Sequence, residues 1–277
     1  MLYSFIYIYF ITYFACRQEE IKEKHPNFAA LLPDCRWRIF GRLFMEQIYT
    51  IPVNEAVDRV TEGGECACPF CLLYKKLEED ELEIILGASM MEPDIRIKTN
   101  EEGFCARHYS KMLLRKRMLG MGLIMQSHLA EVEKKLKGPL VSLNPRSAAL
   151  SDLSRLECDC YVCGRINKNI SAMTATTAYL WESDPEFERK MKKIPFLCLP
   201  HYRALMEYAS KKLNKKKFAD LYDTVRAIEE AYMKVLRGDV DWFCKKFDYR
   251  YDEEPWYNSK DSVQRSIKFL SGEMSLD

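Results

Sequence analysis

Glycine and proline are scarce in this sequence, with 11 of each among 277 residues. Turn-rich β-sandwiches and barrels depend on both residue types, so their scarcity favours helices. The chain also has no stretch in which apolar and polar residues alternate as they do in a half-buried strand. These two absences together predict an all-α fold.

An excess of charge of one sign is also missing, because the formal net charge is only +1. A nearly neutral chain has no general attraction for nucleic acid or anionic lipid. The hydrophobic content of 48% and charged content of 30% are those of a globular protein. No phosphate-binding loop, zinc-protease motif or dinucleotide fingerprint occurs. The sequence therefore gives no reason to predict an enzyme.

The first 16 residues are almost wholly apolar but fit no standard targeting segment. A signal peptide would begin with a basic residue, and none precedes Arg17. A transmembrane helix would need about 20 apolar residues. For residues 1–44 three interpretations stay open: an upstream extension before a start at Met45, a short apolar anchor, or a buried helix. A membrane is an expected partner only if residues 1–16 are expressed.

Cysteine is the abundant exception, and eight of the 11 cysteines fall into two groups. Residues 66–71 read C-x-C-x2-C and residues 105–109 read C-x2-H-Y. The same two patterns recur at residues 158–163 and 198–202. Disulfide frameworks do not need histidine, whereas histidine is a common metal ligand, so we interpret both groups as metal-binding. The ten candidate ligands are Cys66, Cys68, Cys71, Cys105, His108, Cys158, Cys160, Cys163, Cys198 and His201.

The repeated pattern indicates a tandem duplication. Cys71 and Cys105 are 34 positions apart, and Cys163 and Cys198 are 35 positions apart. Each copy also has an acid-Pro-acid triplet, with Pro93 and Pro185 each 22 positions after the last cysteine of its group. We therefore predict a duplicated helical repeat with one metal-stapled helix pair per copy. The predicted divisions are 45–138 for the first repeat, 139–157 for a linker and 158–277 for the second repeat with a C-terminal helix.

Zinc is the expected ion, with two ions per chain. It prefers four thiolate or imidazole ligands in a tetrahedron, and a C-x2-C pair at a helix N-terminus also gains from the helix dipole. Histidine in each set makes an iron–sulfur cluster the less favoured alternative. The expected first set is Cys68, Cys71, Cys105 and His108, and the expected second set is Cys160, Cys163, Cys198 and His201.

Each copy then has one spare cysteine, Cys66 or Cys158. Either could replace a neighbour in the tetrahedron, support the ligands from outside, or act as a reactive thiol. The Cys-Pro-Phe-Cys run at 68–71 also resembles a thioredoxin-type redox pair. It lacks a βαβ setting, however, and the matching run at 160–163 lacks the proline.

Apolar spacing predicts the positions of the helices. In the first copy we expect an extended segment at 48–54, a short helix at 55–60, a helix at 70–88, an irregular connection at 92–104, and one continuous helix after Cys105. In the second copy we expect helices at 162–181 and 185–192, one after Pro200, one running through 221–236 past Gly238, an irregular 248–257, and a last helix capped by Asn258 or Ser259 and stopped by Gly272. The continuous helix carries an apolar stripe expected to pack in the core: Leu114, Met118, Met121, Met125, Leu129, Val132 and Leu136.

Two basic runs, at 111–117 and 211–217, follow the C-x2-H of each copy. Such runs are usually solvated helix faces, and a nucleic acid partner is the weaker interpretation.

The chain resembles a poorly characterised bacterial family found mostly in clostridia and relatives. The resemblance lies in the Ile-Tyr-Thr-Ile-Pro-Val-Asn segment (48–54), the C-x-C-P-x-C run, Pro-Asp-Ile-Arg (93–96) and Gly-Phe-Cys-x2-His (103–108), and it extends to Trp256 and the segment after it. It covers Met45 to about residue 270. The resemblance implies a short cytosolic protein that starts at Met45, and it carries over no activity.

We therefore expect a cytoplasmic, non-enzymatic zinc-binding module that presents a surface to a protein or nucleic acid partner. The alternative is a redox- or metal-sensing protein in which Cys66 and Cys158 are reactive thiols. Labelling of these two thiols alone in the folded protein would favour sensing.

Overall fold

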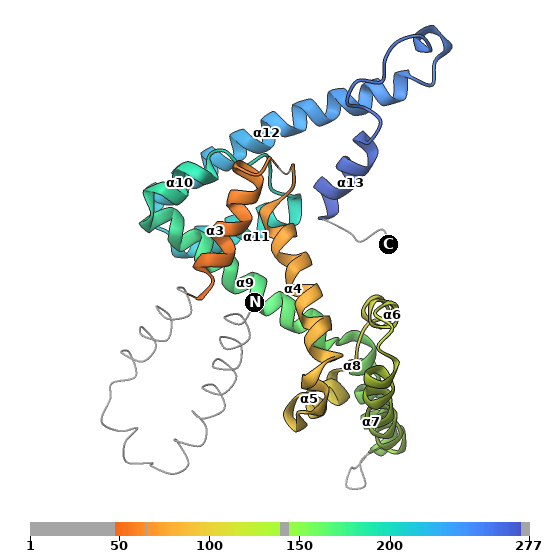
Figure 1. The fold of residues 1–277 in the computed structure, drawn as a ribbon. Coiled ribbons are helices and arrows are strands. Elements are labelled where there is room, and N and C mark those ends of the chain that lie inside the picture. Colours follow the sequence, from red (N-terminus) through yellow and green to blue (C-terminus); the bar gives the residue numbers. More distant parts are fainter. Residues whose placement is uncertain (1–47, 65, 139–143, 273–277) are drawn as a thin grey trace, which may run out of the picture. The chain divides into compact units, whose positions relative to one another are not determined.

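A computed structural model describes residues 48–64, 66–138 and 144–272 of the chain (Figure 1). The described residues from Tyr49 onward form one compact unit, to which all the elements below belong. The apolar run at 1–16 and the three alternatives for residues 1–44 lie outside the described residues.

Helices make up the whole secondary structure of the described residues, among which no strand occurs, so the all-α prediction is confirmed. None of the helices in this part of the chain is both long enough and apolar enough to cross a bilayer. In chain order the elements are α3 (Thr50–Thr61), α4 (Pro69–Ile85), η2 (Ala88–Met91), α5 (Pro93–Glu102), α6 (Ala106–Leu114), α7 (Met118–Lys137), α8 (Pro145–Cys158), α9 (Tyr161–Ser183), α10 (Pro185–Met191), α11 (Leu199–Lys212), α12 (Lys215–Lys245), η3 (Tyr249–Tyr251) and α13 (Ser262–Ser271).

Prolines in the first turns of three helices account for three differences from the sequence-based expectation. The segment 48–54 is not extended, because α3 begins at Thr50 and tolerates Pro52 in its first turn, where backbone N–H groups have no helical acceptor. The connection 92–104 contains α5, which starts at Pro93. Most of the segment 139–157 is α8, whose preceding Asn144 side chain accepts a hydrogen bond from Ser147 N.

The expected continuous helix after Cys105 is two helices, and its apolar stripe is not core. The chain breaks between α6 and α7, where Lys116 has a φ of 55°. After this break the buried residues of α7 are Gly120, Ile124 and His128. Four members of the predicted core stripe are 60–70% exposed: Leu114, Met118, Leu129 and Leu136. Apolar spacing defines a helix face, but it does not say whether anything packs on that face.

The second half follows the sequence prediction more closely. α12 continues unbroken past Gly238, as expected, and α10 begins at Pro185. The residue that caps α13 is Asp261 rather than Asn258 or Ser259. Gly272 ends α13 with a φ of +83°, a value that glycine adopts without strain.

Two groups of buried side chains form the core, and α4 and α9 pass through both. The larger group draws on α3, the start of α4, the second half of α9, and α10 to α13. The smaller group joins the end of α4 and the start of α9 to α6 and α7. Leu77 of α4 and Ile170 of α9 pack against both groups. These two helices therefore connect the first half of the sequence to the second.

Candidate metal centres

All four ligand pairs begin a helix in the same way. The first cysteine of each pair, at position 68, 105, 160 or 198, is the N-cap residue, with an extended ψ between 118° and 161°. The second member lies three residues later, in the first turn, so both side chains project from one helix end. The first turn leaves backbone N–H groups unpaired, and the helix dipole favours negative charge there. Each pair is therefore placed where thiolates are stabilised.

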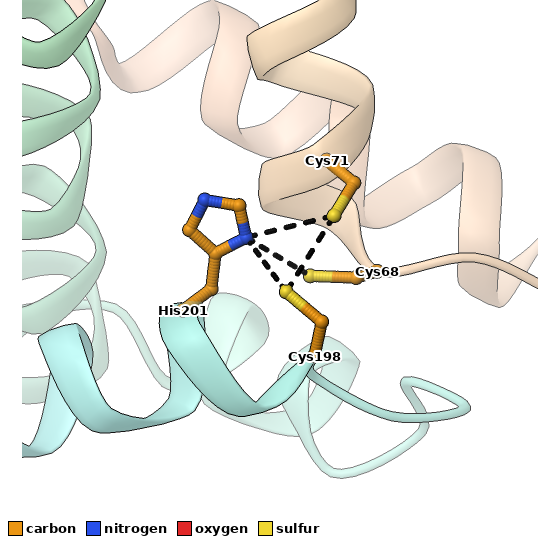
Figure 2. A group of neighbouring side chains, drawn as sticks. All are labelled: Cys68, Cys71, Cys198 and His201. Carbon is orange, nitrogen blue, oxygen red and sulfur yellow. Dashed lines mark hydrogen bonds between the residues drawn. The ribbon is translucent and has the colours of Figure 1, made fainter. Parts of the chain in front are cut away.

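The first cluster, which we call the Cys68 cluster, combines the start of α4 with the start of α11 (Figure 2). His201 Nδ1 lies 3.7 Å from Cys68 Sγ, 3.6 Å from Cys71 Sγ and 3.0 Å from Cys198 Sγ. Cys71 Sγ lies 3.6 Å from Cys198 Sγ. Figure 2 shows the four side chains pointing toward a common centre from two helices.

The second cluster, which we call the Cys105 cluster, combines the start of α6 with the start of α9. His108 Nδ1 lies 3.2 Å from both Cys105 Sγ and Cys160 Sγ, and 3.4 Å from Cys163 Sγ. Cys105 Sγ and Cys163 Sγ are 3.9 Å apart. This set therefore has the same ligand composition as the first.

The ligand pairs are combined across the two halves of the chain, not within each half as the sequence-based pairing expected. The C-x2-C of the first half, Cys68 and Cys71, meets the C-x2-H of the second half, Cys198 and His201. The reciprocal combination forms the Cys105 cluster, and the expected sets of one helix pair per copy do not form. The physical reason is that α4 and α9 pack along each other, which brings the start of each near a helix from the other half.

The spacing of the ligand atoms fits one metal ion per cluster. Zinc bonds of about 2.3 Å to sulfur and about 2.0 Å to nitrogen place tetrahedral ligand atoms roughly 3.5–3.8 Å apart. The sulfur–sulfur distances of 3.6 and 3.9 Å and the sulfur–nitrogen distances of 3.0–3.7 Å lie around these values. In each cluster all four ligand atoms lie within 4.8 Å of one another. Both clusters could therefore hold a metal ion with four protein ligands.

The Cys68 cluster lies in the larger core. Cys68, Cys71 and Cys198 are 5% exposed or less. The Phe70 ring stacks on the His201 ring with 5.4 Å between centroids. Burial raises the pKa of the Cys68 thiol, whereas hydrogen bonding with Cys198 and Cys68 lowers the pKa of the Cys71 thiol. Binding an ion here must therefore displace protons from the thiols.

The Cys105 cluster is supported by a buried carboxylate, Glu78 of α4. With its proton on Nε2, His108 donates to Glu78 Oε1 at 3.1 Å, and this leaves Nδ1 free to face the thiolates. Glu78 is 4% exposed, and it also accepts from Lys111 at 2.7 Å and pairs with Arg107 at 2.8 Å. Burial alone would raise the pKa of Glu78, but the hydrogen bonds from His108 and Lys111 outweigh it and lower the pKa to about 2.

Histidine and cysteine in this cluster also influence each other. Burial opposes the charged form of His108, but hydrogen bonds to Cys160 and Glu78 raise its pKa to about 9. Burial alone would raise the pKa of Cys160, but the hydrogen bond to His108 and the backbone hydrogen bonds from Cys163 and Cys105 together lower it to about 6. The charged form of His108 carries a proton on Nδ1 as well as on Nε2. A metal ion bound at Nδ1 would replace the Nδ1 proton, as expected for a ligand set that binds metal in competition with protons.

Glu78 is a functional residue that the sequence analysis does not identify, because it begins an acidic stretch, 78–81, of the kind that usually lies on a solvated helix face. The signal was present in the spacing. Glu78 lies seven residues after Cys71 and four before Leu82, so it falls on the same helix face as these buried residues. A single acid on an otherwise apolar helix face is seldom solvated.

Cys66 and Cys158 lie outside both ligand sets, although the structure brings together the other eight candidate ligands. Both are exposed and unbridged, as is Cys244. The basic runs are partly committed to ion pairs: Lys111 binds Glu78, Arg117 binds Glu83, and Lys217 binds Glu188 at 3.2 Å. The thioredoxin-like run at 68–71 begins a helix, and the described part of the chain contains no β-strand of a redox fold.

Comparison with known proteins places the chain in a family. A model of the DUF6062 family, described as a family of unknown function, matches residues 44–277, so the chain belongs to this family. No curated protein and no solved structure matches the chain.

Proposed function

We propose that this member of a family of unknown function is a non-enzymatic zinc protein whose two ions hold its helices in place so that they present a surface to a protein partner. The observation that carries the proposal is the pair of closed ligand sets, each with three cysteines and one histidine at single-ion spacing. Structural zinc sites use four protein ligands, whereas catalytic sites leave one position open for water or substrate. Four protein ligands per cluster support a structural role.

Zinc accounts for these ligands better than iron–sulfur does. Iron–sulfur clusters are held by thiolates around several metal atoms, which spread the ligands farther apart than one ion does. The short distances and the histidine Nδ1 in each set favour one ion of borderline softness. Thiolate ligands also need to stay reduced, so we assign the protein to a reducing compartment such as the cytoplasm.

Combining ligands across the halves gives the ions a specific structural task. One ion would join the starts of α4 and α11, and the other would join the starts of α6 and α9. Between the two ligand pairs of the Cys68 cluster lie more than 120 residues, so this ion closes a very long loop. Neither half of the chain has a complete set by itself. The ions would therefore hold together the two halves of one fold rather than stabilise two separate domains.

Counting the ions in paired cysteine variants of the full chain tests the proposal. Native mass spectrometry of the unmodified protein, purified without chelator, should give two zinc ions per chain. Cys71→Ser with Cys198→Ser should remove one ion, because both residues serve the same cluster. Cys71→Ser with Cys105→Ser should remove both. If the second pair removed one ion and the first pair removed both, the within-half sets would be correct; absence of any ion would overturn the proposal.

Exposure of the two spare cysteines supports a second candidate, a redox- or metal-sensing protein. Cys66 and Cys158 each lie two residues before a ligand and are open to solvent. Peroxide would oxidise either thiol to a sulfenic acid. This acid would then condense with the neighbouring ligand thiol to form a disulfide and water, and the ion would lose that ligand. If this is so, Cys66→Ser and Cys158→Ser should slow peroxide-induced zinc release, and Cys244→Ser, a third exposed cysteine, should not. Equal release rates in all three variants would argue for the structural role alone.

A further inference from the structure

The segment between α12 and α13 is fixed by a buried lysine. The Lys246 ammonium, in a residue only 7% exposed, donates to the backbone oxygens of Tyr251, Asp252 and Glu254 at 2.6, 3.0 and 2.7 Å. Trp242 Nε1 of α12 donates to the Pro255 oxygen at 3.0 Å. Two side chains, Trp242 in α12 and Lys246 directly after it, thus bind four carbonyl groups of one short segment. We call residues 247–257 the aromatic tip.

Aromatic rings pack beneath and within the aromatic tip. The Trp242 ring meets the edges of Tyr251 and Tyr257 with centroids 5.8 and 5.4 Å apart. The Phe243 ring contacts Phe247 at 5.3 Å and Trp256 at 5.9 Å. These contacts limit the side-chain freedom of Phe247, Tyr251, Trp256 and Tyr257, so these four side chains lose little conformational entropy when the tip binds a partner.

Three large aromatic side chains of this fixed segment nevertheless face solvent. Phe247 is 77% exposed, Tyr249 84% and Tyr257 69%. Because these three rings are mostly exposed, they contribute little to the stability of the fold. Rigid aromatic side chains on a surface are the residues that most often dominate binding energy at protein interfaces.

Charge decides which partner fits the aromatic tip. It contains four carboxylates and one guanidinium, a net charge of −3. The guanidinium of Arg250 is held by both carboxylate oxygens of Asp248. Asp252, Glu253 and Glu254 are exposed, and their carboxylates have no ion pair among the described residues. Nucleic acid and anionic lipid would be repelled by this surface, whereas a cationic group could meet both a carboxylate and an aromatic face.

We infer that the aromatic tip binds an arginine- or lysine-rich segment of a partner protein. Guanidinium or ammonium groups would lie over the faces of Tyr249 and Tyr257 and pair with the three exposed carboxylates. The inference rests on the proposed function, because it names the surface and the partner class of an interaction module. The tip lies outside both ligand sets, so the two proposals can be tested separately.

The test measures binding of a fluorescent peptide of alternating arginine and glycine to the full zinc-loaded chain, by anisotropy at about 0.15 M salt, where weak long-range attraction is screened. We expect saturable binding that weakens about tenfold in the double variant Tyr249→Ala, Tyr257→Ala. Tyr179→Ala, which removes a tyrosine 38% exposed on α9, is the matched control and should leave binding unchanged. Both variants should keep two ions, which shows that a loss of binding does not come from loss of metal.

Several outcomes would overturn the inference. Absence of peptide binding by the zinc-loaded chain would do so, as would equal binding by the double variant and the control. Stronger binding of a glutamate–glycine peptide, a single-stranded oligonucleotide or neutral lipid vesicles would assign the aromatic tip to a different partner. If the protein instead failed to bind zinc but still bound the peptide through the tip, the proposed zinc sites would be wrong and the surface assignment would stand.

Discussion

The two ligand clusters have the same ligand types but different surroundings, as one buried glutamate near each cluster shows. Beside the Cys105 cluster, Glu78 contacts a ligand histidine and two cations, and its pKa is lowered to about 2. Near the Cys68 cluster, Glu229 of α12 accepts the Leu197 N–H at 2.7 Å, one residue before Cys198. Its second oxygen is buried without a hydrogen-bond partner among the described residues, and burial raises its pKa to about 7.

This contrast indicates that equal ligand sets are stabilised by different means. Three thiolates and one zinc ion carry a net charge of −1, which costs free energy inside a protein unless something compensates it. Around the Cys105 cluster, Arg107 and Lys111 supply positive charge, and Glu78 orients the histidine. Around the Cys68 cluster, apolar packing predominates: its three cysteines belong to the larger core. The Cys105 cluster therefore depends on a charge network, and the Cys68 cluster depends on burial.

The largest expected effect is loss of a ligand, and it should be greater in the Cys68 cluster. We expect Cys198→Ser to lower the free energy of unfolding by on the order of 5 kcal/mol, and Cys163→Ser by about 3 kcal/mol. The reason is that Cys198 is fully buried among helices of the larger core, whereas Cys163 is only half-buried. Chemical unfolding of both variants, with Cys244→Ser as an unaffected control, measures the difference. Equal losses would mean that burial does not distinguish the two centres.

The next effect concerns pH and the unpaired carboxyl of Glu229. The Glu229 carboxyl has a pKa of about 7 in the folded protein, above the ordinary 4.5. Its protonated form therefore contributes fully to stability below pH 4.5, and this contribution is lost as the pH rises through 7. Glu229→Gln should therefore be more stable than the unmodified protein at pH 8, by up to roughly 3 kcal/mol, and the gain should shrink toward pH 5.

Chemical unfolding at several pH values within this range, with zinc retention checked at each, measures the gain. The matched control is Glu230→Gln, the exposed neighbour on α12, which should give a curve parallel to that of the unmodified protein. A parallel curve for Glu229→Gln would show that this carboxyl is ionised in the folded state at all these pH values.

How far the sequence alone could lead is clearest from these same residues. The ligands were predictable because C-x2-C and C-x2-H are local patterns, and each one begins a helix whatever its partner is. Their pairing was not predictable, because separations of 34 and 35 residues within each half allow a closed set as readily as the combination found. Only the packing of α4 along α9 decides between them, and this packing is a property of the whole core.

The helices show the same limit. Continuous apolar spacing predicted α12 correctly. It did not predict the break at Lys116, because a positive φ in one residue does not change the spacing of apolar residues. The apolar stripe that includes Leu129 was predicted to be core, because periodicity identifies a helix face but does not show whether anything packs on it. Leu129 is in fact 63% exposed. Glu78 was not identified from the sequence, because its partners, His108 and Lys111, come from another helix.

Removing the carboxylate from the Cys105 cluster sharpens the comparison between centres. Glu78→Gln should weaken metal binding at this cluster by about 10- to 100-fold, because an amide orients the His108 imidazole less strongly than a carboxylate does. The Cys68 cluster should keep its affinity. Competition with a chromophoric chelator measures the affinities, and the NMR signals of cadmium-substituted protein assign the change to one site.

Glu81→Gln is the control for this substitution. Glu81 lies on the same helix, is 5% exposed and pairs with Arg165 at 3.0 Å, but it touches no ligand. Its substitution should leave both affinities unchanged. If both substitutions weakened metal binding equally, the cause would be a general loosening of α4 rather than loss of the contact with His108.

The smallest expected effect compares two glycines, one beside the Cys68 cluster and one far from any ligand. Gly272 ends α13 with a positive φ, and a Cβ added there would lie 3.7 Å from Cys198 Sγ, which leaves enough space but strains the backbone. Gly272→Ala should therefore destabilise the protein by about 1 kcal/mol. Gly238 lies inside α12 with open space around it, so Gly238→Ala should stabilise by about 0.5–1 kcal/mol. Thermal unfolding that moved both variants in the same direction would show that the end of α13 is not held in this conformation against the Cys68 cluster.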